Sequence, residues 1–275
     1  MADNVEIGKS IVTGGFNTNY HDQGKGESVL LIHGSGPGVT AWANWRLTIP
    51  ALSESFRVLA PDMVGFGYTE RPEDVTYDMD TWVNHAINFL NEVEIEKTAI
   101  IGNSFGGALA LAITTRYPQR VSRLVLMGSV GVDFELTDGL DKVWGYTPSI
   151  ENMKELLDIF AYDRGLVTDE LAELRYQASI RPGFHEAFSA MFPEPRQRWV
   201  EAMSIPEQAI RDIVQPTLII HGREDQVIPL NNSLLLFNLI DNAQLHLFGR
   251  CGHWTQIEHA EEFNRIVATF LGEDD

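Results

Sequence analysis

The chain has 275 residues, 44% of them hydrophobic, and a formal net charge of −19 at pH 7. This length and composition are typical of a folded globular protein and exclude a disordered chain. The acidic balance, with no cluster of Lys and Arg, argues against a nucleic-acid partner.

The cysteine content and the first residues of the chain bear on where the protein works. Cys251 is the single cysteine, which excludes an internal disulfide and favours a reducing compartment. The start of the chain has neither the basic residues nor the apolar stretch of an export signal, and no apolar run approaches the ~18 residues of a membrane span. We therefore expect a cytoplasmic protein without a membrane partner.

Strand-like and helix-like segments alternate along most of the chain. Residues 9–22 alternate in polarity and turn at Gly14-Gly15, which predicts an antiparallel hairpin. Largely apolar runs, typical of buried parallel strands, follow at residues 29–33, 56–61, 98–102, 123–128, 217–221 and 244–248. Helical patterns lie between them, for example at residues 81–93 and 108–116. The alternation predicts an α/β fold, in which helices cover both faces of a mostly parallel sheet.

A glycine-rich turn, His33-Gly34-Ser35-Gly36-Pro37-Gly38, follows the first of these parallel strands. It is not a phosphate-binding loop, because the Gly-Lys-Ser/Thr ending and the second half of a dinucleotide fingerprint are both missing. Such a turn can instead present a backbone amide to a developing oxyanion. We assign the oxyanion hole to the amides of Ser35 and Phe105, and one such donor is worth ~3 to 4 kcal/mol in the best measured case.

A second turn, Gly102-Asn103-Ser104-Phe105-Gly106, joins the strand at 98–102 to the helix at 108–116. This is the context of a nucleophile elbow, where a serine is held in a strained conformation and the flanking glycines avoid collisions with neighbouring backbone. Short Gly/Ser motifs occur by chance, but the strand and helix around this one indicate that Ser104 is a catalytic nucleophile. On the residues alone, Asn103 could merely cap the elbow.

The pattern changes between residues 131 and 211, where helical segments replace strands at residues 150–162, 169–180, 185–191 and 196–203. Prolines at positions 148, 182, 193 and 195 interrupt this part of the chain. An all-helical insertion at this place would cover an active site as a cap. The expected division is a first core part at residues 1–132, a helical cap at residues 133–211 and a second core part at residues 212–275.

The other two members of a catalytic triad are expected after the serine, first an acid and then a histidine. Asp225 lies just beyond the strand at 217–221, and we prefer it to Glu224, whose side chain points elsewhere one residue earlier. His253 follows the strand at 244–248, and Gly252 before it would let a short loop carry the imidazole back over the sheet. The sequence thus predicts Ser104 as nucleophile, His253 as base and Asp225 as the acid that orients it.

Taken together, these residues resemble the α/β-hydrolase superfamily and, more narrowly, the meta-cleavage product hydrolases, which cut carbon-carbon bonds in ring-fission products of aromatic compounds. The resemblance runs nearly end to end. Within the family, residues 127–132 and 181–184 most resemble the members that act on 2-hydroxymuconic semialdehyde, with those of the cumene and toluene pathways second. The stretches of this sequence that carry the family resemblance are residues 33–38, Asn44, residues 102–107, 144–149 and 174–180, and Cys251-Gly252-His253-Trp254.

The resemblance also implies two groups of substrate-binding residues. Those expected to bind the carboxylate and 2-hydroxy end of an anionic dienoate are Asn44, Asn103, Arg175 and Trp254. Those expected to shape the acyl-side pocket are Trp144, Phe160, Val227 and Ile228. The planar guanidinium of Arg175 suits a carboxylate, although a salt bridge to Glu170 or Glu173 on the same helix is the alternative.

The implied reaction converts a 2-hydroxy-6-oxohexa-2,4-dienoate into 2-hydroxypenta-2,4-dienoate and a carboxylic acid, without a metal or organic cofactor. The resemblance further implies a homo-oligomer, a dimer or a tetramer. An ordinary carboxylesterase with the same triad is one alternative, and a non-catalytic ligand receptor with this fold is another.

Overall fold

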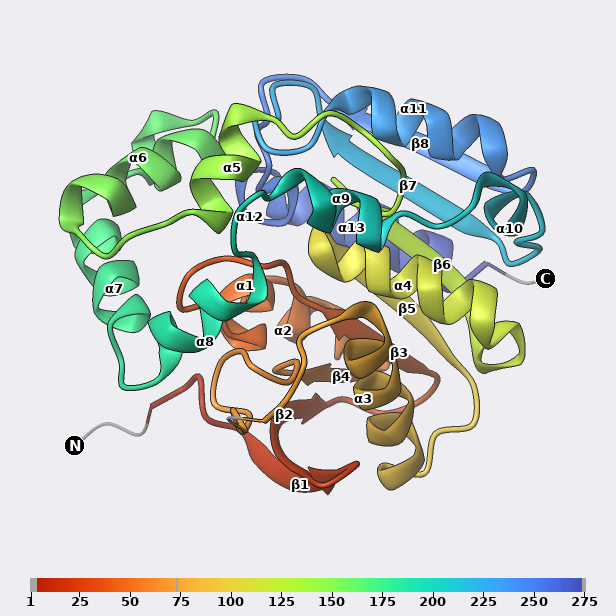
Figure 1. The fold of residues 1–275 in the computed structure, drawn as a ribbon. Helices are drawn as coiled ribbons and strands as arrows, with labels where there is room; N and C mark the ends of the chain where they lie inside the picture. The colour runs from red at the N-terminus through yellow and green to blue at the C-terminus, as the bar shows by residue number, and fades with distance from the viewer. Residues whose placement is uncertain (1–3, 73, 274–275) are drawn as a thin grey trace.

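The computed structural model describes residues 4–72 and 74–273, and its centre is an eight-stranded sheet (Figure 1). The strand order is β1-β2-β4-β3-β5-β6-β7-β8, with β1, β2 and β4 paired antiparallel and all other neighbours parallel. The predicted hairpin and the predicted α/β class are confirmed. The strands are β1 (Lys9–Thr13), β2 (Phe16–Gln23), β3 (Ser28–Ile32), β4 (Arg57–Pro61), β5 (Thr98–Asn103), β6 (Val121–Met127), β7 (Thr217–Gly222) and β8 (Ala243–Phe248).

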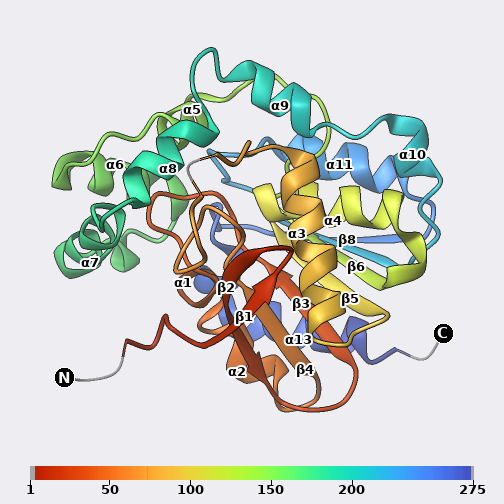
Figure 2. The same ribbon diagram turned by 60° about the horizontal axis from the view of Figure 1, so that its bottom comes forward.

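Helices cover both faces of the sheet (Figure 2). One face is covered by α3 (Met79–Glu92), α4 (Phe105–Arg116) and α11 (Leu230–Leu239). The other is covered by α1 (Ala41–Trp45), α2 (Thr48–Leu52) and α13 (Ala260–Leu271), which the short α12 (Thr255–Glu258) precedes. A 3-10 helix, η1 (Pro118–Arg120), leads into β6.

The apolar runs of the parallel strands supply both layers of the core. In β3, Leu30 packs into the cluster beneath α3 and α4, whereas Leu31 packs into the cluster beneath α1, α2 and α13. Ile100 and Ile101 of β5 divide in the same way, because successive side chains of a strand point to opposite faces. Full burial of such a residue contributes about 1.5 to 3 kcal/mol, which is why these strands carry no polar face.

The insertion after β6 is helical, with no strand among its described residues, and its first helices lie to the left of the sheet in Figure 1. In Figure 2 these helices lie above and to the left of the strands. Hydroxyls of Thr137, Ser149 and Thr168 cap the first three helices by accepting from backbone amides, at about 1 kcal/mol each. The elements of the insertion are α5 (Asp138–Trp144), α6 (Ile150–Phe160), η2 (Arg164–Leu166), α7 (Asp169–Ser179), α8 (Phe184–Met191) and α9 (Gln197–Met203).

The two ends of the insertion meet where the amide of Ile205 donates to the carbonyl of Gly131, 2.9 Å away. The next helix, α10 (Glu207–Arg211), packs against the core helices α4 and α11, although the expected cap runs to residue 211. The sequence of a short helix does not show whether it packs on the cap or on the core, so the boundary could not be placed before α10 from the sequence. None of the helices in the described part of the chain is long and apolar enough to cross a membrane.

Candidate active site

Ser104 occupies the sharp turn between β5 and α4, with φ of 55° and ψ of −114°. A non-glycine residue held at such angles stores about 1 to 3 kcal/mol of backbone strain. Gly102 and Gly106 make the turn possible: a Cβ at Gly102 would lie 2.3 Å from the carbonyl oxygen of Gly106, and one at Gly106 would lie 2.3 Å from that of Ile32. The turn therefore has the geometry expected of a nucleophile elbow.

Asp225 and His253 meet at the ends of β7 and β8, although 28 residues separate them in sequence. The Nδ1 atom of His253 lies 2.7 Å from Oδ2 of Asp225. The other carboxylate oxygen, Oδ1, accepts from the amides of Val227 (2.7 Å) and Ile228 (2.9 Å). These contacts fix the carboxylate and leave Nε2 of the imidazole for another partner. Glu224, the competing acid, instead accepts from the amide of Cys251.

A second histidine, His221, also reaches the acid, a role that its sequence position did not reveal. Its Nε2 lies 3.3 Å from Oδ2 of Asp225 and 3.1 Å from the carbonyl oxygen of Ile228, and its Nδ1 lies 2.6 Å from the Ser233 hydroxyl. Burial alone would raise the pKa of Asp225, but His253 and His221 outweigh it and hold that pKa well below its ordinary value. The carboxylate is therefore charged at neutral pH.

The histidine loop is held by the cap. The carbonyl of Phe160, at the end of α6, accepts from the amides of His253 (2.8 Å) and Trp254 (3.3 Å). The Phe160 ring stacks on both side chains, with ring centroids 6.0 Å and 5.0 Å away. A Cβ at Gly252 would lie 2.6 Å from that same carbonyl oxygen. The glycine is therefore needed for this close approach of the cap, rather than for an unusual backbone angle.

The two amides assigned to the oxyanion hole come from separate segments: that of Ser35 follows β3, and that of Phe105 starts α4 directly after Ser104. Within residues 4–72 and 74–273, neither the Ser35 nor the Phe105 amide donates to a protein acceptor. The Ser35 side chain is braced by Trp144 of α5, whose Nε1 donates to its hydroxyl at 3.0 Å. Unpaired amides beside the elbow are the arrangement that could stabilise an oxyanion.

A cavity of about 370 Å³ lies between the cap and the strand ends, and Ser104 and His253 both line it. One part of its wall is apolar and comes mostly from the cap. The apolar residues include Leu140, Val143, Met153, Leu157, Phe160 and Val227. The other part carries polar and charged side chains. These include Glu6, Asn44, Arg46, Asn103, Arg175 and Arg181.

At the polar end two asparagines present unused hydrogen-bonding atoms. Asn103 Nδ2 donates to Asn44 Oδ1 at 2.9 Å, which also accepts from the amide of Gly34 at 3.3 Å. Asn44 Nδ2 and Asn103 Oδ1 are buried and have no hydrogen-bond partner among the described residues. The Asn103 side chain bonds to Asn44 and not to the amides of α4, so the geometry does not support the capping alternative. One free donor and one free acceptor fit a ligand that carries both a carbonyl-type oxygen and a hydroxyl.

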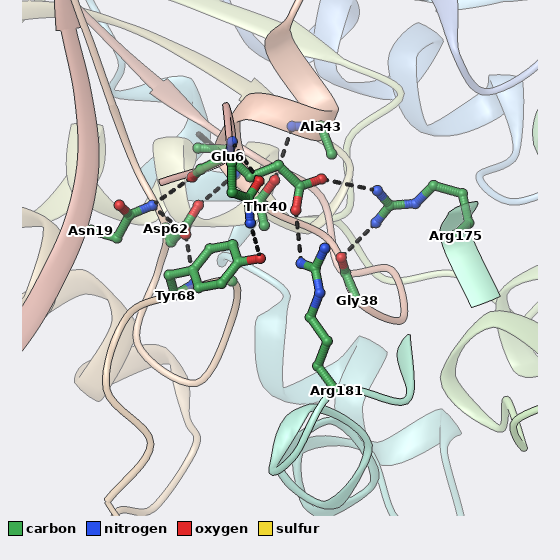
Figure 3. Close-up of polar contacts among 12 residues, drawn as sticks. Glu6, Asn19, Gly38, Thr40, Ala43, Asp62, Tyr68, Arg175 and Arg181 are labelled. Atoms are coloured by element: carbon green, nitrogen blue, oxygen red, sulfur yellow. Dashed lines mark hydrogen bonds and ion pairs between the residues drawn. The ribbon is translucent and has the colours of Figure 1, made fainter. Parts of the chain in front are cut away.

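Arg175 extends from α7 into the polar end of the cavity, and neither Glu170 nor Glu173 is its partner (Figure 3). Its guanidinium donates to the carbonyl of Gly38 in the glycine-rich turn and lies 3.4 Å from a carboxylate oxygen of Glu6. Burial lowers the pKa of Arg175 from its ordinary value, and the Glu6 carboxylate opposes this effect. The salt bridge along the helix that the sequence allowed is therefore absent, and a long-range pair replaces it.

Two of the residues expected in the acyl-side pocket lie elsewhere. Trp144 is buried behind the cavity wall, where it stacks on Phe192 with ring centroids 4.4 Å apart and bonds to Ser35. Ile228 is fully buried, and its backbone holds Asp225 and His221. Neither lines the cavity, whereas the other six residues expected to bind substrate do. Those six are Asn44, Asn103, Phe160, Arg175, Val227 and Trp254.

The described residues include no group of three or more His, Cys, Asp or Glu side chains placed to hold a metal ion. What the site combines is a strained serine, a histidine paired with a buried carboxylate, two unpaired amides and an arginine at one end of a cavity. This set can activate a hydroxyl nucleophile, stabilise an oxyanion and bind an anionic group.

Known proteins are similar to this chain in both sequence and fold. The family model of the alpha/beta hydrolase fold matches residues 27–260. A 2-hydroxymuconate semialdehyde hydrolase of Pseudomonas sp. (strain CF600) is 63% identical over 98% of this chain and 95% of its own length. A 2-hydroxy-6-oxo-2,4-heptadienoate hydrolase of Pseudomonas putida is 60% identical over 99% of each chain.

Among solved structures, a meta-cleavage product hydrolase of Pseudomonas fluorescens IP01 superposes with a TM-score of 0.98. That protein is a serine-to-alanine variant complexed with acetates, and it is 64% identical over 99% of this chain and 100% of its own. Family match, identity along nearly the whole chain and superposition agree with the site described above. The chain therefore belongs to the α/β-hydrolase family and, within it, to the meta-cleavage product hydrolases.

Proposed function

We propose that the protein hydrolyses the carbon-carbon bond between C5 and C6 of a 2-hydroxy-6-oxohexa-2,4-dienoate, either 2-hydroxymuconic semialdehyde or a 6-alkyl analogue. The products are 2-hydroxypenta-2,4-dienoate and a carboxylic acid, which is formate for the semialdehyde. The observation that carries this proposal is one cavity with Ser104 and His253 in its wall and Arg175 at its polar end. Relatives named for such substrates, at 63% and 60% identity, support it.

In this proposal the polar end of the cavity binds the dienoate. Arg175 pairs with the carboxylate, because a guanidinium offers two parallel N–H donors to two oxygens. Asn44 and Asn103 bind the 2-hydroxy group: Asn44 Nδ2 donates to its oxygen, and Asn103 Oδ1 accepts its proton in a hydrogen bond. Trp254, which also lines the cavity, packs against the planar chain of the ligand. The apolar end then receives the C6 substituent.

The reaction has two halves. Carbon is a poor leaving group unless its electrons can enter a carbonyl, so the dienol is first ketonised. The 2-hydroxyl loses its proton to become the C2 carbonyl, and a proton is delivered at C5. His253 then takes the proton of Ser104, whose oxygen attacks the C6 carbonyl, while Asp225 holds the imidazole tautomer. The amides of Ser35 and Phe105 stabilise the oxyanion. The electrons of the broken C5–C6 bond pass along the conjugated chain to the C2 oxygen, which takes the proton from the His253 imidazolium and restores the dienol. Water then hydrolyses the ester left between C6 and Ser104, which releases the carboxylic acid and frees the serine.

The test offers the purified protein four ring-fission products with hydrogen, methyl, isopropyl or phenyl at C6, and follows loss of the dienolate colour. We expect the aldehyde or the methyl ketone to give the highest kcat/KM. The neutral ester p-nitrophenyl acetate serves as the comparison substrate. Turnover of the ester without turnover of any dienoate would indicate a carboxylesterase, and dienoate binding without any turnover would indicate a receptor.

We also propose a cytoplasmic location and a homo-oligomeric state, a dimer or a tetramer. The single cysteine, Cys251, supports the first, because a chain that forms no internal disulfide fits a reducing compartment. The second follows the family resemblance. Size-exclusion chromatography with light scattering measures the subunit count directly.

A further inference from the structure

The segment before β1, residues 4–8, forms part of the cavity wall, and we call it the N-terminal strap. Residues 4–6 line the cavity. The strap is tied to the sheet by Asn19 of β2, which donates to the carbonyl of Glu6 (3.1 Å) and accepts from the amide of Gly8 (2.8 Å). Asn4 donates to the Tyr68 hydroxyl at 2.6 Å. The strap is thus anchored to the core while it faces the cap.

Glu6 projects from the strap between two arginines of the cap insertion (Figure 3). One carboxylate oxygen lies 3.4 Å from Nη1 of Arg175, and the other lies 2.8 Å from Nη1 of Arg181. The side chain of Glu6 is 12% exposed and that of Arg175 14% exposed, so water screens this pair only weakly. The carboxylate therefore joins the core to the cap at the polar end of the cavity.

At this end of the cavity, Glu6 supplies the negative charge that balances several arginines. Three arginines line the cavity, Arg46, Arg175 and Arg181, and Glu6 is the single acidic residue among the described lining residues. The guanidiniums of Arg181 and Arg46 both act to lower the pKa of Arg175, and the Glu6 carboxylate acts to raise it. Without Glu6, Arg175 would face two like charges with no nearby countercharge, and a long flexible side chain would turn away from them.

The contacts of Arg175 show where it is held. Its Nη2 donates to the carbonyl of Gly38, in the turn that carries Ser35. Its Nη1 faces Glu6. A guanidinium has five N–H donors, so these two contacts fix its plane and leave donors for a ligand in the cavity. Glu6 and the Gly38 carbonyl together hold the guanidinium between the strap and the glycine-rich turn.

We propose that Glu6 is a positioning residue, which holds Arg175 in the cavity wall so that its guanidinium receives the carboxylate of the dienoate. The inference rests on the proposed function and adds to it a residue 169 positions away from Arg175 in sequence. Glu6 itself repels an anion, so it does not bind the substrate. Its effect is to keep the cation in place before the substrate arrives, which spares the substrate the cost of ordering it.

The test replaces Glu6 by Gln and measures KM and kcat for the preferred dienoate and for p-nitrophenyl acetate. We expect KM for the dienoate to rise about 10- to 30-fold, with kcat changed by no more than about threefold, because an ordered cation is lost only for the anionic substrate. The ester should keep its kcat/KM within about twofold. Direct titration of the dienoate in a Ser104→Ala background should show the same loss of affinity.

Asp22→Asn is the matched control. Asp22 is also 12% exposed and also pairs with two cations, Lys9 (2.9 Å) and Arg57 (3.0 Å), but it lies outside the cavity lining. Loss of stability from a broken ion-pair cluster should therefore be similar in the two variants, whereas only Glu6→Gln should change KM for the dienoate. Thermal unfolding of both variants measures that shared loss.

Glu6→Asp gives a second arm if the Gln variant does not fold. This variant keeps the negative charge, but its side chain is one methylene shorter, so the carboxylate lies farther from Arg175. KM for the dienoate should therefore lie between those of the wild type and the Gln variant. An unchanged KM in the Gln or Asp variant, or an equal loss on dienoate and ester, overturns the role of Glu6. A wild-type protein that does not cleave the dienoates instead overturns the proposed function, so the two failures are distinguishable.

Discussion

The two ends of the cavity are built in different ways. At the polar end, Arg175, Asn44 and Asn103 are fixed by hydrogen bonds to the core and to the strap. At the apolar end, the wall consists of side chains that only pack, most of them from the cap helices α5 and α6. Ser104 and His253 line the same cavity, and in the proposed reaction they form the reacting centre.

This difference predicts how each end responds to mutation. A charge left without its partner in a water-poor site weakens binding by roughly 2 to 5 kcal/mol. One methylene in an apolar pocket changes the discrimination between two substrates by only about 1 to 3 kcal/mol. The polar end should therefore decide whether a dienoate is processed, and the apolar end should decide which C6 substituent is preferred. Substitutions at the reacting centre should affect every substrate.

The largest expected effect is at the centre. Ser104→Ala and His253→Ala should each remove almost all turnover of dienoate and ester, a loss of roughly 10⁶-fold in kcat. The double variant should be little worse than either single one, because residues that act as a unit are not additive. Steady-state kinetics of the three variants check this, and purely additive losses would contradict the triad.

Asp225→Asn should keep the fold and lower kcat by about 10⁴-fold on both substrates, because the imidazole is left in the wrong tautomer. Glu224→Gln is the matched control, since the Glu224 carboxylate bonds to Arg223 and to the amide of Cys251 rather than to His253. If the Glu224 variant showed the larger loss, the assignment of the acid would be wrong.

Arg175→Gln should separate the polar end from the centre. It leaves the dienoate carboxylate without its partner, and kcat/KM should fall about 30-fold to several thousandfold. The ester p-nitrophenyl acetate has no carboxylate and should lose no more than a few-fold. Parallel kinetics on the two substrates measure the difference, and equal loss or no loss would defeat the assignment of Arg175 as the substrate anchor.

Motifs with local causes could be predicted from the sequence. Gly102 is required by contacts within the turn itself, whereas Gly106 is required by the close approach of β3, but both belong to a short motif that stands out in the sequence. The strands are marked by their own apolar runs, so the α/β fold and the position of Ser104 could be predicted directly. Asp225 could be preferred to Glu224 because adjacent side chains point apart after a strand. The structure adds His221, whose contact with Asp225 depends on a loop that folds back over the end of β7.

Long-range partners could not be predicted in this way. The sequence offered Glu170 and Glu173, on the same helix, as partners for Arg175, but the carboxylate that pairs with it belongs to Glu6 in the strap. Trp144 and Ile228 have the bulk of pocket residues, and only the fold shows that the Trp144 side chain bonds to Ser35 and that Ile228 is buried outside the cavity lining. Hydrophobicity indicates burial, but it does not tell which side of a wall a side chain occupies.

The smallest expected effect is at the apolar end, where Val227 lines the cavity and its neighbour Ile228 does not. Val227→Ala keeps the backbone bonds to Asp225 and removes two methyl groups from the wall. The ratio of kcat/KM for the phenyl ketone to that for the methyl ketone should then rise by up to about 10-fold.

Ile228→Val is the control for this change, since each substitution costs about 1 to 2 kcal/mol of stability but only one widens the cavity. Competition between the two ketones in one assay gives the ratio directly, because both draw on the same enzyme. Because Arg175 and the two asparagines are untouched, KM for the methyl ketone should stay within about threefold in both variants. A ratio that moved equally in the two variants would mean that loosened packing, rather than the size of the pocket, selects the C6 substituent.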